Sequence, residues 1–156
     1  MKEEFETSTT ISIRQLSLDD LHTYKGFCNK LPDPERYKQY WENEGDRLFN
    51  SDGANVMFGL WDNDKLIGQT VIAFDPDNRK RLAVFCESEI DPEYRGKGLA
   101  KSLYDARKQY VEEIGFKGEI ETHIKPDNIP SLKAANRNGF FQTGEMHKGY
   151  CVLKAT

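Results

Sequence analysis

The feature that most constrains this chain is the stretch IDPEYRGKGLA (residues 90–100), which joins a strand-like apolar run to an amphipathic helix. Gly96 and Gly98 stand at the start of that helix, where a Ser, Thr, Asp or Asn cap is usual. The first helical turn therefore opens with unpaired main-chain N–H groups beside the charges of Arg95 and Lys97. Such a turn favours a diphosphate site, because a helix N-terminus carries partial positive charge. The alternative interpretation is a solvated basic turn between a strand and a helix.

Two common phosphate-binding motifs are excluded in this stretch. The Walker sequence Gly-x-x-x-x-Gly-Lys-Ser/Thr is absent from the chain. The dinucleotide fingerprint requires a third glycine where Lys101 stands, and it places its glycines directly after the strand. Here residues 91–94 intervene, so any diphosphate site belongs to another class.

Composition narrows the function classes further. A chain of 156 residues is expected to form one domain over residues 1–156, and its formal charge of −4 argues against nucleic-acid binding. No apolar run reaches the length of a membrane helix, so we expect no membrane partner. Cys28, Cys86 and Cys151 lack metal-ligand spacing. They indicate reduced thiols in a cytoplasmic protein without a metal.

The order of predicted elements gives the fold class. Strands are expected at residues 11–14, 56–61, 66–74, 81–90, 119–124, 140–146 and 149–153. Helices are expected from Ser17, with Asp20 at the capping-box position, and at residues 31–50, 99–114 and 129–138. The predicted buried face of the third helix consists of Leu99, Leu103, Ala106, Tyr110 and Ile114. This order predicts an α+β sandwich with a mixed sheet, in which the strands at 81–90 and 119–124 run parallel.

The stretch around Arg95 resembles the acyl-CoA signature Arg/Gln-x-x-Gly-x-Gly/Ala of the GNAT superfamily of N-acetyltransferases, met here by Arg95, Gly98 and Ala100. A second segment is similar to the same family, since Asn128 and Ser131 are followed by Gly139-Phe140 at the usual spacing. The resemblance implies a GNAT-like α/β/α sandwich. Its mixed, mostly antiparallel sheet of six to seven strands would be splayed between the fourth and fifth strands.

The resemblance also implies acetyl-CoA as cosubstrate. The backbone of Glu89 and Ile90 would pair with the pantetheine, while Asn128 and Ser131 would approach it from the following helix. The phosphates would take the main-chain N–H groups of Arg95, Gly96, Lys97, Gly98, Leu99 and Ala100.

The resemblance places three candidates near the acceptor amine. Glu87 is the first candidate for general base, and strand alternation would put Glu87 and Glu89 on the face of Phe85 unless a bulge intervenes. His123, five residues before Asn128, is the second candidate, because imidazole changes charge near neutral pH. The alternative for each is a solvated strand residue.

Other possible catalytic groups have weaker support. His22 and His147 have no recognisable partners in the sequence. Many members of the family carry a general-acid Tyr four residues before the Gly of Gly-Phe, but this chain has Ala135 there. The proton donor to the leaving thiolate is then Ser131, Tyr104, water or nothing.

The predicted helix at 31–50 carries aromatic residues, such as Tyr37, Tyr40 and Trp41, interleaved with acidic ones. The main interpretation of the aromatic residues is core packing, and the alternative is an aromatic and acidic lining that binds an amine.

The predicted function is direct transfer of an acetyl group from acetyl-CoA to an amine of a small molecule, polyamine or peptide. A noncatalytic acyl-CoA-binding sensor is the alternative. A homodimer paired through the closing strands is compatible with the resemblance.

Overall fold

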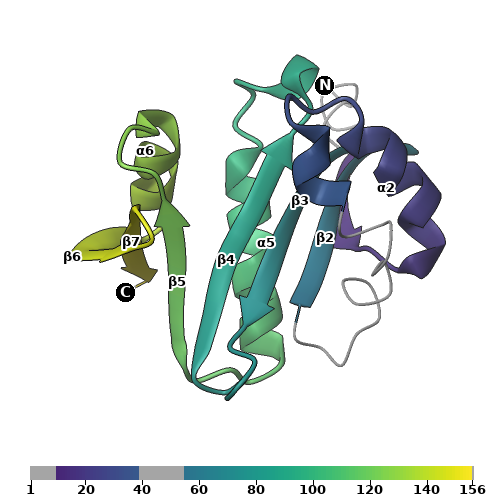
Figure 1. Cartoon of the computed structure of the whole chain (residues 1–156). Coiled ribbons are helices and arrows are strands. Elements are labelled where there is room, and N and C mark those ends of the chain that lie inside the picture. The colour runs from purple at the N-terminus through teal and green to yellow at the C-terminus, as the bar shows by residue number, and fades with distance from the viewer. Residues whose placement is uncertain (1–9, 39–54, 156) are drawn as a thin grey trace, which may run out of the picture.

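The computed structural model describes residues 10–38 and 55–155 and shows one mixed sheet flanked by helices. Its seven strands have the order β1-β2-β3-β4-β5-β7-β6 (Figure 1). They are β1 (Ile11–Gln15), β2 (Asn55–Asp62), β3 (Lys65–Phe74), β4 (Leu82–Ile90), β5 (Glu119–Ile124), β6 (Phe140–His147) and β7 (Tyr150–Ala155). The α-helices are α2 (Leu21–Cys28), α5 (Ala100–Glu113) and α6 (Ile129–Arg137), and short 3₁₀ helices are η1 (Leu18–Asp20), η2 (Pro34–Tyr37) and η3 (Pro92–Tyr94). The predicted fold class is therefore confirmed.

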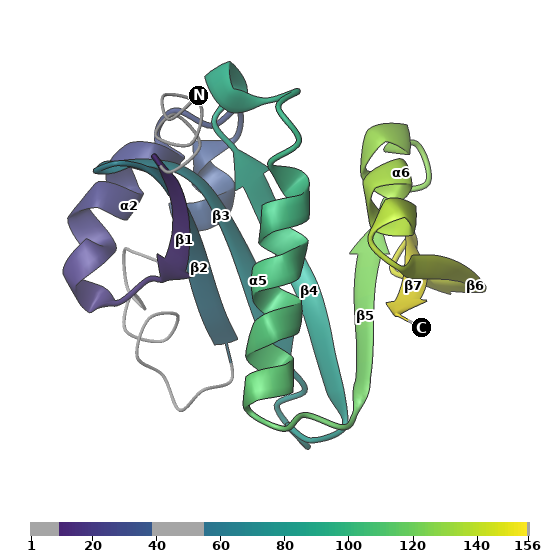
Figure 2. The same cartoon turned by 180° about the vertical axis from the view of Figure 1, so that it is seen from behind.

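The sheet is antiparallel except where β4 meets β5. These two strands pair in parallel only between Leu82–Phe85 and Glu119–Thr122. Strand β4 then continues to Ile90 and β5 to Ile124 without further pairing between them. The strands diverge from that point (Figures 1 and 2), so the predicted splay is present.

Helices cover both faces of the sheet. Helix α2 lies on one face and α5 on the other, as the two opposite views show (Figures 1 and 2). On the α2 side, Tyr24, Phe27 and Tyr37 pack into one buried cluster. On the α5 side, Phe85, Tyr104, Val111 and Phe140 belong to another, and this second core supports the splayed part of the sheet.

One sequence prediction about helices needs correction, and another lies largely outside the described residues. The buried residues of α5 are Leu103, Tyr104, Arg107 and Val111, a face rotated from the predicted one, and Ile114 is 52% exposed. In the segment predicted as a helix over 31–50, residues 34–37 form only a 3₁₀ turn. Residues 39–50, with Tyr40 and Trp41, lie outside the described residues.

The capping interaction predicted at the start of the first helix is present. The main-chain N–H of Ser17 donates to Asp20 Oδ2 at 2.9 Å, which is the capping interaction expected there. Cys28, Cys86 and Cys151 are free thiols. No helix in the described ranges has the length and apolar character to cross a membrane.

Candidate functional site

The turn between β4 and α5 is held in place by side chains of β2 and of the turn itself. Asp91 caps η3 by accepting a hydrogen bond from the Glu93 main-chain N–H at 2.9 Å. The Tyr94 hydroxyl donates to Asp62 Oδ2 at 2.6 Å, and the Lys97 ammonium lies 5.3 Å from the centre of the Tyr94 ring. These contacts fix the approach of the chain to the start of α5.

Beyond Tyr94, the turn contains main-chain N–H groups that have no hydrogen-bond acceptor among the described residues. Gly96 and Gly98 have φ values of +78° and +76°, which glycine adopts without steric cost. Within the described part of the chain, the main-chain N–H groups of residues 96–99 donate no hydrogen bond. Four such donors at a helix N-terminus fit an anionic group such as a diphosphate.

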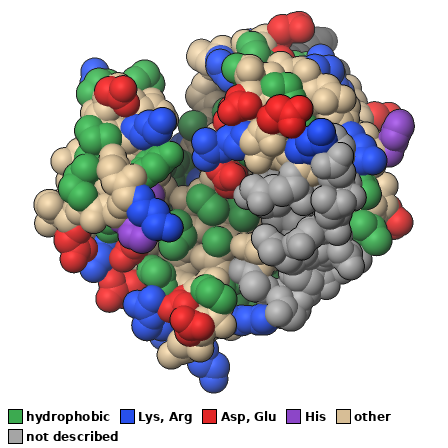
Figure 3. Space-filling model, viewed as in Figure 1, with side chains coloured by type: hydrophobic (Ala, Val, Ile, Leu, Met, Phe, Trp, Pro, Cys, Tyr) green, Lys and Arg blue, Asp and Glu red, His purple; other side chains and the backbone are tan. Residues whose placement is uncertain are grey.

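The divergence of β4 and β5 opens a cleft of about 490 Å³ that extends along β4 to Glu89, one residue before the strand ends. Figure 3 shows a hollow between the part formed by β5–β7 and α6 and the rest of the molecule, with apolar side chains inside it and charged ones around its rim. The lining residues are Arg36, Tyr37, Phe85, Cys86, Glu87, Ser88, Glu89, Tyr104, Thr122, His123, Ile124, Lys125, Asn128, Ser131, His147, Lys148 and Tyr150.

A β-bulge sets the orientation of the two acidic residues of β4. Gln69 is opposite Glu89 and Val71 is opposite Cys86, so Glu87 and Ser88 together face a single residue of β3. Glu87 has φ +52°, a conformation that is rare for a residue with a side chain. Gln69 Nε2 supports the bulge by donating to the Glu87 carbonyl at 2.9 Å.

The bulge corrects the predicted strand face. Phe85 packs in the α5-side core, 5.5 Å from Phe140 between ring centres, whereas Glu87 and Glu89 contact residues of η2. The two carboxylates therefore share a face with each other but not with Phe85. Glu87 and Glu89 were expected on the face of Phe85 unless a bulge intervened, and the structure contains that bulge.

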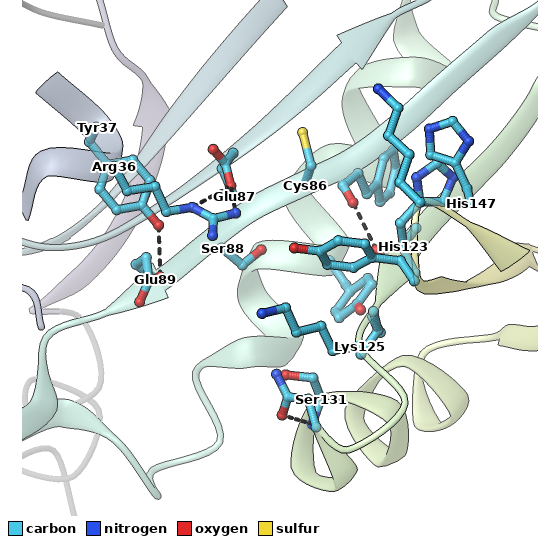
Figure 4. Close-up of a pocket in the computed structure, with 17 residues that line it drawn as sticks. Arg36, Tyr37, Cys86, Glu87, Ser88, Glu89, His123, Lys125, Ser131 and His147 are labelled. Atoms are coloured by element: carbon cyan, nitrogen blue, oxygen red, sulfur yellow. Dashed lines mark hydrogen bonds and ion pairs between the residues drawn. The ribbon is translucent and has the colours of Figure 1, made fainter. Parts of the chain in front are cut away.

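Arg36 and Tyr37 of η2 hold these two carboxylates. Arg36 Nη2 donates to Glu87 Oε1 at 2.6 Å, and the Tyr37 hydroxyl donates to Glu89 Oε2 at 2.7 Å (Figure 4). The hydrogen bond to Glu87 raises the pKa of Arg36, so the guanidinium stays charged. Burial, and then the bond to Glu89, raises the pKa of Tyr37, so its hydroxyl remains a donor.

The opposite wall of the cleft carries an imidazole beside a carboxylate. His123 Nε2 lies 3.0 Å from Glu121 Oε1, and the His123 side chain is 23% exposed. The ring of His147, at the end of β6, lies 5.2 Å from the His123 ring between centres (Figure 4). The prediction that His147 has no partners is therefore wrong, because the β6–β7 hairpin brings it to β5. His22 lies on α2 and is exposed.

Helix α6 contributes its first turn to the cleft. Asn128 Oδ1 accepts a hydrogen bond from the Ser131 main-chain N–H at 3.3 Å, which is the predicted N-cap. Ala135, where the family resemblance would place a tyrosine, is fully buried in the core. The predicted coenzyme contacts Asn128 and Ser131 thus lie together at one end of the cleft.

The other predicted coenzyme contacts meet at the end of β4. Arg95 Nε donates to the Ile90 carbonyl at 3.0 Å, and Arg95 Nη2 lies 3.8 Å from Glu89 Oε1. The arginine side chain thereby connects β4, which borders the cleft, to the amide-bearing turn, that is, the turn with the unpaired main-chain N–H groups of residues 96–99.

The cleft also contains a thiol, Cys86. Burial raises the pKa of Cys86 to about 12. A thiol with this pKa is protonated at neutral pH, and the thiolate is the nucleophilic form. Cys86 is therefore unsuited to carry an acyl group.

A buried arginine packs against the inner part of the cleft. Arg107 is 1% exposed, and its guanidinium carbon lies 4.6 Å from the Phe85 ring centre and 4.8 Å from that of Tyr104. Within the described residues no carboxylate forms an ion pair with it, and Nε donates to the Leu103 carbonyl at 3.0 Å. Burial lowers the pKa of Arg107 to about 10, so the side chain is still a cation at neutral pH.

This buried charge predicts an unusual stability effect. We expect Arg107→Met to leave the free energy of unfolding unchanged or to raise it by about 1–4 kcal/mol, because apolar packing replaces a charge without a counter-ion. The pKa of Arg107 is lower in the folded than in the unfolded chain, so the wild type should recover stability relative to the variant above about pH 10. Urea unfolding at several pH values measures both effects. A loss of stability in the variant at neutral pH would contradict the prediction.

Several residues in the cleft or in contact with its lining residues were missed by sequence reasoning. Arg36, Glu121, His147 and Arg107 were not among the predicted site residues. Only Glu121 had a local signal, since it stands two residues before His123 and so on the same strand face. Within the described ranges no group of three His, Cys, Asp or Glu side chains could hold a metal ion.

Comparisons with known proteins agree with this architecture. Residues 17–140 match the model of the acetyltransferase (GNAT) family. A search of curated proteins finds no significant match.

Solved structures with the same fold include three acetyltransferases. The PaiA N-acetyltransferase of Thermoplasma acidophilum in complex with coenzyme A has 17% identity and a TM-score of 0.74, covering 94% of this chain and 98% of that one. The spermidine N-acetyltransferase of Vibrio cholerae has 21% identity and a TM-score of 0.65, covering 94% and 92%. An acetyltransferase of Salmonella typhimurium that modifies the N-terminal serine of ribosomal protein L7/L12 has 17% identity and a TM-score of 0.69, covering 95% and 94%.

Proposed function

The chain belongs to the GNAT family of acetyltransferases, and from this premise we propose that it moves an acetyl group from acetyl-CoA directly to a primary amine. The observation that carries the proposal is the row of unused amides at residues 96–99, beside a cleft between two diverging strands. Such a row fits the diphosphate of coenzyme A without any side chain. The pantetheine would then lie along Ile90, with Asn128 and Ser131 at the far side of the cleft.

The acceptor amine enters from the side of the two acidic residues. Glu87 and Glu89 provide a negative wall for an ammonium group, and the acceptor must lose a proton before it attacks. His123 is the proposed base because its Nε2 is paired with the carboxylate of Glu121, which orients the ring. Glu87, the first candidate from the sequence, is instead paired with Arg36, and this favours a role in binding the acceptor.

Direct transfer is favoured over a covalent acyl-enzyme. The thiol in the cleft, Cys86, is protonated at neutral pH, as its raised pKa indicates. Attack of the amine on the thioester carbon then needs both substrates bound at once. We further propose that the protein works in the cytoplasm, where its three free thiols remain reduced.

The first experiment identifies the class of acceptor amine. Small polyamines and peptide N-termini are the two main candidates, because they are the substrates named for two of the similar structures. We expect thiol release from acetyl-CoA in the presence of one class in a panel of polyamines, aminoglycosides, amino acids and short peptides. Coenzyme A binding by calorimetry is measured in parallel. Binding without turnover across the panel would support the noncatalytic sensor instead, and absence of both would contradict the proposed function.

A further inference from the structure

The mechanism above leaves the departing thiolate without a proton donor, because Ala135 removes the usual tyrosine of α6. Building on the proposed function, we propose that Tyr104 of α5 is the general acid of the transfer, and that buried Arg107 stabilises the phenolate that Tyr104 becomes. The donor would thus come from the helix beneath the sheet rather than from α6.

The position of Tyr104 supports this role. It is 9% exposed, and it lines the cleft together with Phe85 and Thr122, the last residues at which β4 and β5 still pair. The thioester must lie in the gap that opens beyond this point if the pantetheine runs along β4 from the amide-bearing turn. Tyr104 belongs to the α5-side core and therefore reaches the cleft from the side of the sheet opposite to Glu87 and Glu89.

Arg107 accounts for how a buried tyrosine can serve as an acid. Burial raises the pKa of Tyr104, which keeps the proton on the hydroxyl but makes the group a weak donor. The positive charge of Arg107 acts in the opposite direction and lowers the pKa of Tyr104. The cation therefore reduces the cost of forming the phenolate at the moment of transfer.

The buried cation itself otherwise has no explanation in the fold. The acidic groups that act on Arg107 are the Tyr104 hydroxyl and the Cys86 thiol, and both belong to residues lining the cleft. A guanidinium buried beside two groups that are neutral at rest is unfavourable for stability. It becomes favourable when negative charge develops in the cleft.

The proposed step is balanced in atoms and charge. The amine nitrogen, whose ammonium proton has passed to solvent through His123, forms a bond with the thioester carbon and gives a second proton to His123. The carbon–sulfur bond breaks with its electron pair remaining on sulfur. The sulfur takes the proton of the Tyr104 hydroxyl, which gives coenzyme A as a free thiol and a phenolate beside Arg107. The phenolate is reprotonated from solvent or from the proton taken up by His123.

The test is Tyr104→Phe, which keeps the ring packing on Phe140 at 5.4 Å and on Arg107 but removes the hydroxyl. We expect single-turnover thiol release to fall about 100-fold, while the KM for acetyl-CoA and the melting temperature stay the same. Tyr110→Phe is the matched control, because Tyr110 is on the same helix but outside the cleft, and its turnover should equal that of the wild type.

Arg107→Met supplies the second readout. We expect it to slow thiol release in the wild type but to have no further effect in the Tyr104→Phe background, because both residues act on the same step. Additive effects, or a Tyr104→Phe rate within threefold of the wild type, would overturn the inference and leave the proposed function standing. A wild-type chain that neither binds coenzyme A nor releases thiol would overturn both.

Discussion

Replacement of Gly98 by valine is expected to weaken coenzyme A binding by about 100-fold or more, which corresponds to the loss of about two charge-assisted hydrogen bonds. Gly98 has φ +76°, and a Cβ built there meets no atom within 4 Å. The new side chain therefore causes no clash within the protein. It disfavours the positive φ and occupies the space in front of the unused amides, where the diphosphate would lie.

Gly115 offers a matched control for this substitution. It follows the other end of α5, has φ +72°, and likewise has open space around its Cβ position. Valine at either position should cost about 1–2 kcal/mol of stability, since both require a left-handed backbone. Only Gly98→Val should lose affinity for coenzyme A in calorimetry. Equal affinities of the two variants would contradict the assignment of the turn as a diphosphate site.

The sequence predicted the parts of this site that depend on local chemistry. Glycine spacing and the absence of a cap identified the turn before α5, and the order of strands and helices predicted the parallel β4–β5 pair. The Asn128 cap was predicted in the same way, because a capping side chain acts on an amide only three residues away. The turn and the cap are decided within one or two turns of chain, whereas the parallel pair follows from the order of the elements along the chain.

Long-range partners could not be predicted in this way. Arg36 reaches Glu87 across 51 positions, and Tyr37 reaches Glu89 across 52. No periodicity within η2 or β4 contains that information. His147 was likewise dismissed because its neighbour, His123, lies on another strand and is brought close only by the closing hairpin.

Two local errors had physical causes. The alternation of Phe85, Glu87 and Glu89 is compatible with either a regular strand or a bulge, and the choice depends on pairing with β3. The predicted buried face of α5 contained only apolar and aromatic residues and so omitted Arg107, because arginine is seldom buried. One error falls on the cleft residue Glu87, which has a strained backbone, and the other on Arg107, a buried charge packed against the cleft residues Phe85 and Tyr104.

The assignment of the base can be decided by comparing His123→Gln with Glu87→Gln. We expect His123→Gln to lower kcat about 100-fold with little change in the acceptor KM, because glutamine keeps a polar side chain but cannot take the proton. His22→Gln, on the exposed face of α2 and outside the cleft, is the control and should behave as the wild type.

Glu87→Gln should have the opposite signature. Loss of this carboxylate leaves the guanidinium of Arg36 without its 2.6 Å partner in the acceptor side of the cleft, so an incoming ammonium meets a positive charge. We expect the acceptor KM to rise roughly tenfold, equivalent to ~1.4 kcal/mol, with kcat changed less. If Glu87→Gln instead lowers kcat 100-fold and His123→Gln does not, then Glu87 is the base. Arg36 would in that case have to move away before the amine binds, because a carboxylate held at 2.6 Å by a guanidinium is not placed to take a proton from the substrate.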